Sequence, residues 1–178
     1  MTPLQGRRIE LREFTLEDVD AVVAWSGDPA VTRHLTWEDG GRGSALSFLR
    51  YLIGESTRQP RQAFELAMVE LESGEVVGAA GMRVRNWQHR RADVGYVLRR
   101  DRWGRGYTTE AVGLLIELGF ELGMHRIEAT CHPDNRASAR VMEKNGMRYE
   151  GRLRHLHHVR GEWRDSLLYA IVAGDAPD

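Results

Sequence analysis

Two glycines, Gly104 and Gly106, stand between two segments of different periodicity, and Arg102 and Arg105 are interleaved with them. Residues 93–98, just before them, alternate between two faces, as a β-strand does. The residues after them place apolar side chains on one helical face: Ala111, Leu114, Leu115 and Leu118. A glycine turn that opens a helix directs free backbone N–H groups and the positive end of the helix dipole at one point. This stretch therefore predicts an anion site, for which phosphate is the usual ligand.

The spacing of the glycines narrows the kind of phosphate ligand. A Walker loop requires a lysine after its last glycine, and none follows Gly106. A dinucleotide fingerprint requires a third glycine at the position that Thr109 occupies. What remains is a strand, a G-x-G turn with interleaved arginines, and a helix. A plain turn without a ligand is the alternative interpretation.

A second polar motif lies further along the chain, where Asn135 follows a strand-like segment and Ser138 comes three residues later. Asn135 fits the N-cap of a helix and equally a ligand contact. Together, W-G-R-G-Y-T-T-E-A (103–111) and N-R-A-S-A-R-V-M-E-K-N-G-M (135–147) resemble the two signatures of the GNAT N-acetyltransferases. The form is most similar to the RimJ/RimL branch, which acetylates ribosomal-protein N-termini. One departure is Asp101, where the family has Gln or Arg, and Arg102 is then expected to supply the charge.

The resemblance implies one domain spanning residues 1–178, with a mixed α/β GNAT fold. That fold is a twisted, mostly antiparallel sheet of about six to seven strands flanked by about four helices. Its strands splay apart after the central strand, and acetyl-CoA lies in the splay. The implied acetyl-CoA contacts are Tyr96, Val97, Leu98, Arg102, Trp103, Gly104, Arg105, Gly106, Tyr107, Thr108, Asn135 and Ser138. The first three would act through their main chain.

The resemblance also suggests a catalytic set of Ser138, Asn135 and Asp93. Met142 stands where many GNAT enzymes place a tyrosine, so Ser138 is implied as the group that stabilises the departing thiolate. No single general base is evident, and the acidic candidates are Asp93, Glu65, Glu38 and Asp39. An α-amine, with a pKa of about 8, is partly neutral near pH 7, whereas a lysine at about 10.4 is almost wholly charged. A weak base therefore favours an α-amine as acceptor.

Acceptor contacts are expected from Trp37 and Glu38, in a polar loop at residues 34–43, and from Trp87. The alternative for this loop is a solvated segment in which Trp37 packs down for burial. The first functional hypothesis is acetylation of an α-amine such as a protein N-terminus. The others are acetylation of a small-molecule amine, such as an antibiotic or an amino-acid conjugate, and a catalytically silent CoA-binding module. A homodimer is implied as well.

Composition argues against several other classes. A net charge of −1 provides no general attraction for nucleic acid. One cysteine, Cys131, precludes an intrachain disulfide and suits a reducing cytoplasm. The N-terminus lacks the apolar core of a signal peptide, and no run reaches the roughly 20 apolar residues of a membrane span. His155 and His157 are expected on one strand face, with His158 on the other, and no further ligand at zinc spacing accompanies them, so no metal is expected.

These residues must be positioned by an ordered series of elements. Periodicity and turn residues predict strands at 8–14, 62–71, 76–84, 93–98, 126–131, 147–158 and 163–173. Helices are predicted at 15–25, from Ser44 onward, from the glycine turn to Gly123, and at 135–145. The helix from Ser44 would bury Phe48, Leu49, Leu52 and Ile53. The resulting order, β-α-α-β-β-β-α-β-α-β-β, matches the fold that the resemblance implies.

Overall fold

The computed structural model describes residues 1–36 and 41–175, and within them one mixed sheet of eight strands runs through the molecule. The strands lie in the order β1-β2-β3-β4-β5-β6-β8-β7. Their bounds are Leu4–Gln5 (β1), Ile9–Glu13 (β2), Ala63–Glu70 (β3), Val76–Asn86 (β4), Arg91–Leu98 (β5), Arg126–Cys131 (β6), Arg148–Val159 (β7) and Glu162–Val172 (β8). Neighbouring strands are antiparallel except β5 and β6, which are parallel.

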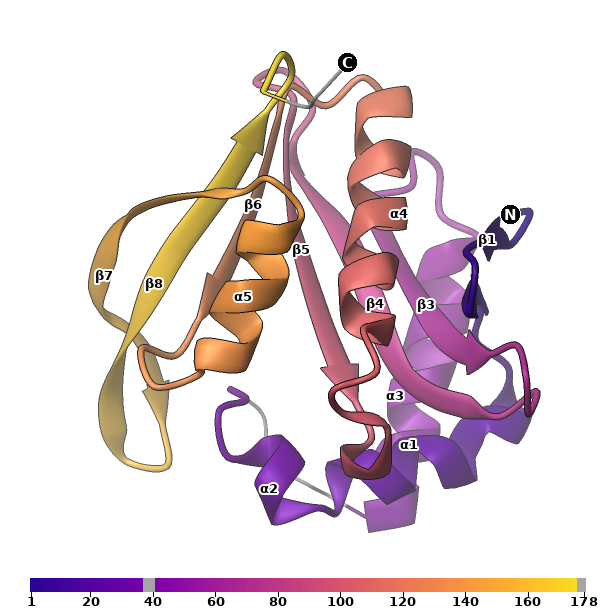
Figure 1. Ribbon diagram of the computed structural model, residues 1–178. Helices are drawn as coiled ribbons and strands as arrows, with labels where there is room; N and C mark the ends of the chain where they lie inside the picture. Colours follow the sequence, from indigo (N-terminus) through magenta and orange to yellow (C-terminus); the bar gives the residue numbers. More distant parts are fainter. Residues whose placement is uncertain (37–40, 176–178) are drawn as a thin grey trace.

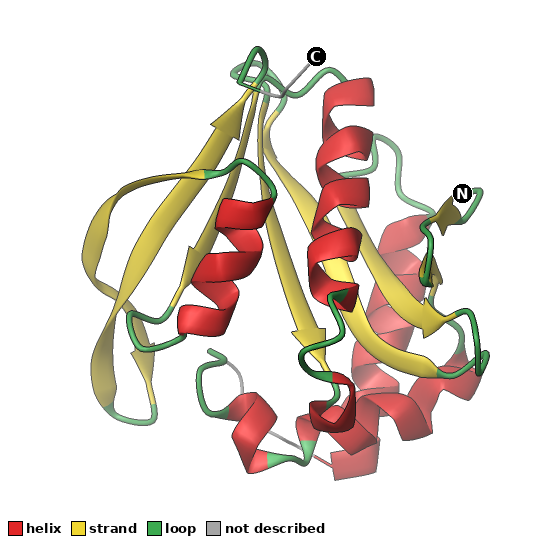
Figure 2. Cartoon of the chain, in the orientation of Figure 1, coloured by secondary structure: helices red, strands yellow, loops and turns green. Residues whose placement is uncertain are grey.

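Five helices in the described residues cover the two faces of the sheet (Figures 1 and 2). They are Val19–Ser26 (α1), Pro29–Thr32 (α2), Gly41–Ser56 (α3), Tyr107–Glu121 (α4) and Arg136–Lys144 (α5). The helices α4 and α5 lie on one face, whereas α1 and α3 lie on the other. Each face has its own core of buried side chains, and successive residues of β3 alternate between them, with Leu66 and Met68 in one and Ala67 and Val69 in the other.

The strands β5 and β6 pair only at one end. Their register runs from Arg91 with Arg126 to Asp93 with Glu128, although β5 continues to Leu98. Beyond this point the two strands diverge into an open V, with α5 beside it and the glycine turn at its mouth (Figure 1). The parting of two adjacent parallel strands leaves one edge of β5 without a strand partner.

The predicted elements are all present, with local differences. The sheet has eight strands in the described residues rather than six or seven, and the short strand β1 is an addition. Helix α3 begins at Gly41 rather than Ser44, and Phe48 is exposed rather than buried. Ala45 is buried instead, together with Leu49 and Leu52. These three residues stand at i, i+4 and i+7 and form the helix face that packs onto the sheet.

The histidines of β7 do not alternate as predicted. The register of β7 against β8 shifts between Leu153 and His157, and His155 has a left-handed φ of 52°. Such a bulge inserts extra residues into one strand and redirects the side chains that follow. As a result His155 and His158 both lie against Trp163, whereas His157 faces the opposite way.

Candidate active site

The glycine turn adopts the conformation that an anion-binding loop requires. Gly104 and Gly106 have left-handed φ angles of 77° and 81°, which residues with a side chain rarely adopt. The first backbone hydrogen bond of helix α4 runs from Glu110 N–H to the Gly106 carbonyl, at 3.1 Å. The N–H groups before it therefore lack an intrahelical partner and form the positive end of the helix. They border a pocket of about 430 Å³ whose other walls carry Arg7, Arg8, Arg105 and Lys144.

Arg8 ties the start of the chain to this loop. Its guanidinium donates to the Arg105 carbonyl at 2.6 Å and to Glu110 Oε2 at 3.0 Å. Its backbone N–H donates to Glu110 Oε1 at 2.8 Å. Burial raises the pKa of Glu110, but these Arg8 hydrogen bonds lower it by more, so the carboxylate stays charged. Arg8 and Lys144 were not predicted to contact the ligand, because both lie far from the glycine turn in the chain.

A buried carboxylate, Glu70, supports the loop from below. Its side chain accepts from Tyr107 Oη at 2.6 Å, from Ser73 Oγ at 2.7 Å and from Arg102 Nε at 3.2 Å. These bonds, that of Tyr107 first, lower the pKa of Glu70 to about 2. The guanidinium of Arg102 also pairs with Glu75 and Asp101. The side chains of Tyr107 and Arg102 are thus bonded within the protein. The phosphate contact predicted for these two residues would then be made by their backbone.

The main-chain groups of β5 point alternately toward β4 and toward the V. Arg99 N–H donates to the Val77 carbonyl at 2.8 Å, so odd-numbered residues of β5 form the hydrogen-bonded pairs with β4. Tyr96 and Leu98 therefore direct their main-chain groups into the V, whereas those of Val97 are directed at β4. The indole Nε1 of Trp103 donates to the Leu98 carbonyl at 2.9 Å, which fixes the glycine turn to the end of the strand.

The side chain of Tyr96 reaches across the V to Ser138. The two hydroxyl oxygens are 2.8 Å apart, and Tyr96 Oη also donates to the Ser138 carbonyl at 3.1 Å. Burial raises the pKa of Tyr96 to about 12, against the opposing effect of the Ser138 hydrogen bond, so the phenol is neutral at physiological pH. Burial likewise raises the pKa of Cys131, whose thiol neighbours the Ser138 side chain, to about 11. The phenol and the thiol next to Ser138 therefore both keep their protons.

The start of α5 presents Ser138 in this position. Asn135 is the N-cap, and its side-chain oxygen accepts from Ser138 N–H at 3.1 Å. The capping interpretation of Asn135 is therefore correct, and a ligand contact remains a prediction. Met142, one turn further on, is fully buried in the core on the α4 side. The position of a sulfur relative to residue 142 remains a prediction.

Glu65 and Asp93, two of the candidate general bases, lie on the face of the sheet opposite α5. Glu65, Gly81 and Gly95 are paired in a row across β3, β4 and β5. A Cβ at Gly81 would lie 1.9 Å from Glu65 Oε2, whereas a Cβ at Gly95 would meet open space. Glu65 therefore extends over Gly81 toward an open floor. Burial raises the pKa of Glu65 and Asp93 raises it further, against the effect of two arginines.

Comparison with known proteins gives the family. The model of the acetyltransferase (GNAT) domain family matches residues 8–148. The chain belongs to the GNAT acetyltransferases. An N-acetyltransferase of Bacillus licheniformis, p20, whose name describes it as uncharacterized, is 30% identical over 97% of both chains. A GNAT acetyltransferase from Bacillus anthracis is 27% identical with a TM-score of 0.84, over 96% of this chain and 98% of that one.

A second solved structure shows the same GNAT fold with a ligand. It is RimL, the ribosomal L7/L12 α-N-protein acetyltransferase, in complex with coenzyme A. It superposes with a TM-score of 0.85 over 98% of this chain and 99% of its own, at 19% identity. At that identity the likeness shows the fold alone. The present chain is an N-acetyltransferase by family, and its architecture is the GNAT fold that the two sequence motifs implied.

Not every predicted residue comes to the GNAT site. Trp37 and Glu38 lie outside the described residues, as does Asp39. Trp87 is exposed in the β4–β5 turn, before the first residue of β5, whereas the V opens beyond Asp93 and is widest at the other end of this strand (Figure 1). Trp87 therefore lies away from the mouth of the V, and its contact with an acceptor remains a prediction. Asp93 lies at the apex of the V, with its carboxylate paired to Arg85.

The described part of the chain contains neither a metal-binding cluster nor a membrane-spanning helix. No three His, Cys, Asp or Glu side chains within residues 1–36 and 41–175 are arranged to hold a metal ion. None of the helices in the same residues is long and apolar enough to cross a membrane.

Proposed function

We propose that this GNAT enzyme transfers the acetyl group of acetyl-CoA directly to an α-amine, such as a protein N-terminus. The observation that carries the proposal is the V between β5 and β6, which opens beside the glycine turn. Main-chain groups of Tyr96 and Leu98 face into this V and can hydrogen-bond an extended ligand as an added strand would. A pantetheine phosphate has a phosphate end and an extended arm. The pocket at the glycine turn suits the phosphates, and the strand edge next to it suits the arm.

The residues around the pocket fit the charge and shape of a CoA pyrophosphate. The glycine turn offers backbone N–H groups, and Gly104 leaves open space where a side chain would stand. Arg7, Arg8, Arg105 and Lys144 supply positive charge around a volume of about 430 Å³. Acetyl-CoA would supply the activated acetyl group, and this chain's residues would hold and orient it.

Ser138 and Tyr96 are proposed to stabilise the leaving thiolate. A thiolate of a thiol with an ordinary pKa of about 8.5 needs a hydrogen bond rather than a strong acid to leave near neutral pH. The Ser138 hydroxyl can donate that bond when the neutral Tyr96 phenol directs its one proton to Ser138 Oγ instead of to the Ser138 carbonyl. Both protons stay on their own oxygen atoms. The stabilisation is largest when the negative charge develops, which is when it lowers the barrier.

Glu65 is the proposed base for the ammonium form of the acceptor. Asp93 is ion-paired with Arg85, whereas Glu65 forms no ion pair with a residue of the described ranges and extends toward the open floor at Gly95. Its raised pKa makes it a better proton acceptor than an ordinary carboxylate. A carboxylate remains a weak base, and it suits an α-amine better than a lysine side chain.

Acetylation of a small-molecule amine is the second candidate function. It is favoured by a small, half-open cavity of about 60 Å³ at the end of β6, which is the size of a functional group rather than a peptide. We further propose that residues 1–178 act as one cytoplasmic domain, and that the exposed side chains Tyr149, Leu156 and Trp163 of the β7–β8 hairpin are covered in a homodimer. Light scattering at tens of micromolar tests the dimer.

The test of the proposed function is an assay with acetyl-CoA and a panel of amines. The panel holds peptides with free N-termini, the same peptides with blocked N-termini and an internal lysine, and small amines. Release of free CoA and mass spectrometry identify the acetylated atom. Acetylation of free N-termini but not of lysine supports the proposal. Acetyl-CoA binding without acetylation of any amine would leave only the CoA-binding module.

A further inference from the structure

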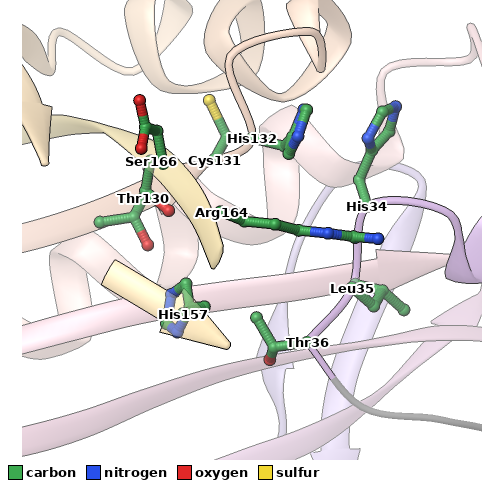
Figure 3. A pocket seen from close by; sticks show the side chains of 10 residues that line it. His34, Leu35, Thr36, Thr130, Cys131, His132, His157, Arg164 and Ser166 are labelled. Carbon is green, nitrogen blue, oxygen red and sulfur yellow. The ribbon is translucent and has the colours of Figure 1, made fainter. Parts of the chain in front are cut away.

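The end of β6 opens onto a cavity that the chemistry above does not use. It has a volume of about 60 Å³, and its walls come from the segment after α2, from the end of β6 and from the β7–β8 hairpin (Figure 3). Cys131 lies in its wall, and its thiol neighbours the Ser138 side chain, so the cavity adjoins the proposed reaction centre. One water needs about 10–15 Å³, so the cavity accepts a group of a few heavy atoms.

A cation that forms no ion pair with an acid of the described residues crosses this cavity. Arg164 extends from β8 toward His34, and in Figure 3 its guanidinium lies between His132 and Leu35. Its hydrogen bond within residues 1–36 and 41–175 is to the Arg33 carbonyl, at 3.3 Å. Arginine presents several N–H donors in one plane and matches a carboxylate with two parallel hydrogen bonds. Here those donors face a cavity.

Histidines add further donors to the same walls. The rings of His34 and His132 are stacked with their centroids 5.0 Å apart. The backbone N–H of Asp134 donates to His132 Nδ1 at 3.2 Å, so the neutral ring carries its proton on Nε2. His157 is turned into the cavity by the bulge in β7. A bulge next to a cavity commonly serves to redirect one side chain in this way.

The potential in this cavity is positive. Burial lowers the pKa of His34, and His132, Arg33 and Arg164 lower it further, against one exposed acid, Asp134. The other titratable group of this wall besides Cys131 and His157 is Asp165. Its Oδ2 accepts from Arg152 Nε at 2.6 Å, and its Oδ1 accepts from His155 N–H at 2.8 Å. Arg152 balances the charge of Asp165, so among residues 1–36 and 41–175 the exposed Asp134 is the acid that opposes the cationic donors.

We infer that this cavity binds a carboxylate of the acceptor, with Arg164 as its main partner, and that the acceptor is therefore an amine that carries a carboxylate. The inference rests on the proposed function, because it uses the reaction centre next to Cys131. Two sources present the same chemistry: the α-carboxylate of a free amino acid, and the side-chain carboxylate of an N-terminal Asp or Glu. A polyamine is disfavoured, because its charges have the same sign as those of the cavity.

The test compares acceptors that differ only in the carboxylate. One arm uses phenylalanine against phenylalaninamide, and the other uses the peptide Asp-Ala-Phe-amide against Asn-Ala-Phe-amide. The expected kcat/KM is about tenfold to a hundredfold higher for the carboxylate in one of the arms, in line with a charged hydrogen-bonded pair. The arm that shows the preference identifies the source. A difference below about twofold in both arms would overturn the inference.

Variants assign the preference to the cavity. Arg164→Met should reduce it to a few-fold, mainly by raising KM for the carboxylate acceptor, and Arg164→Lys should keep part of it, since the charge remains without the planar fork. Arg154→Met is the matched control, because it removes the same charge from an exposed position of the same hairpin. A preference that survives Arg164→Met, or that Arg154→Met reduces equally, would also overturn the inference.

An NMR measurement separates this inference from the proposed function. The His34 ring is titrated in the presence of CoA and either N-acetylphenylalanine or its amide. A bound carboxylate should raise the pKa of His34, and the amide should not. A rise without acetylation of any amine would retain the anion site and reject the proposed function. Acetylation of neutral amines without a rise would retain the function and reject the anion site.

Discussion

The hydroxyl groups of Tyr96 and Ser138 lie 2.8 Å apart across the V between β5 and the start of α5. The tyrosine comes from the strand and the serine from the third residue of the helix, so two elements fix the pair. A phenol that burial keeps neutral can orient the serine hydroxyl toward the place where sulfur leaves. Position 142 holds a methionine, and under the proposed function Tyr96 on β5 would take the role of the tyrosine expected there.

Removing the serine hydroxyl should slow acetyl transfer. Ser138→Ala is expected to lower kcat by roughly tenfold to a thousandfold, in line with the loss of one donor to a developing charge. The Kd of acetyl-CoA should change little, because the hydrogen bond gains its strength only as the thiolate forms. Steady-state kinetics and isothermal titration measure the two quantities. The defect should shrink as the pH rises toward the pKa of the CoA thiol.

Tyr96→Phe should have a smaller effect in the same direction, because it removes the partner of Ser138 and leaves the serine in place. The control is Tyr149→Phe, which removes a phenol from an exposed position of β7. Full kcat in Ser138→Ala, with a lower Tm, would show that the serine only supports the start of the helix. Met142→Tyr is not expected to restore activity, since the side chain at 142 is enclosed in the core.

Local sequence patterns were enough to predict the elements and the GNAT loop, because those depend on periodicity and glycine. The partner of Ser138 was not predicted, since it requires the relative placement of β5 and α5. Met142 and Ser138 share one helical face by spacing, yet the sheet encloses the first and leaves the second at the V. The bulge in β7 was invisible for a similar reason: nothing in the alternation of residues 153–158 indicates where the extra residues lie.

The glycine turn should be essential for binding acetyl-CoA. Gly104→Val should abolish the thermal stabilisation by acetyl-CoA, because a side chain would fill the space that the phosphates need. Gly74→Val is the matched control, since Gly74 has a similar φ of 70°, also borders open space and lies in the turn between β3 and β4. Both variants carry the same backbone strain. Equal acetyl-CoA affinity in the two would reject the assignment of the phosphate loop.

The supports of this loop were beyond sequence analysis as well. In the predicted strands, Glu70 is the last residue but one of 62–71, and Arg8 is the first residue of 8–14. Only the fold brings the first to Tyr107 and the second to the Arg105 carbonyl. A buried acid at a strand end is nevertheless a usable signal, because such an acid needs partners and marks a place where several segments meet.

Glu70→Gln should destabilise the protein in a pH-dependent way. The folded pKa of about 2 is below the ordinary value of 4.5, so the stabilisation is fully present above pH 4.5 and is lost as the pH falls toward 2. At pH 7 the expected loss is about 1–3 kcal/mol, the usual cost of disrupting buried hydrogen bonds. Urea unfolding at several pH values checks this. A difference from wild type that does not shrink below pH 4.5 would contradict the assignment of the charge.

Glu65→Gln should change activity and stability in opposite directions. If Glu65 accepts the proton of the acceptor, the amide should lower kcat/KM by roughly a hundredfold to ten-thousandfold. Because burial raises its pKa in the folded state, the ionised carboxylate destabilises the fold at neutral pH. The stability of the fold with protonated Glu65 is fully present below the unfolded-state pKa of 4.5. This stability is lost as the pH rises through the raised pKa of the folded state. The amide escapes this loss, so its Tm should exceed that of the wild type at pH 7–8, and the gain should disappear near pH 4.

The matched variant is Asp93→Asn, whose carboxylate is paired with Arg85 and lies at the apex of the V. It should cost less activity than Glu65→Gln. The acid limb of the wild-type kcat/KM profile should follow the raised pKa of Glu65 and vanish in Glu65→Gln. A stabilised Glu65→Gln protein with full kcat/KM would show that Glu65 is a buried acid without a catalytic role. Loss of activity in Asp93→Asn alone would move the base to the apex of the V.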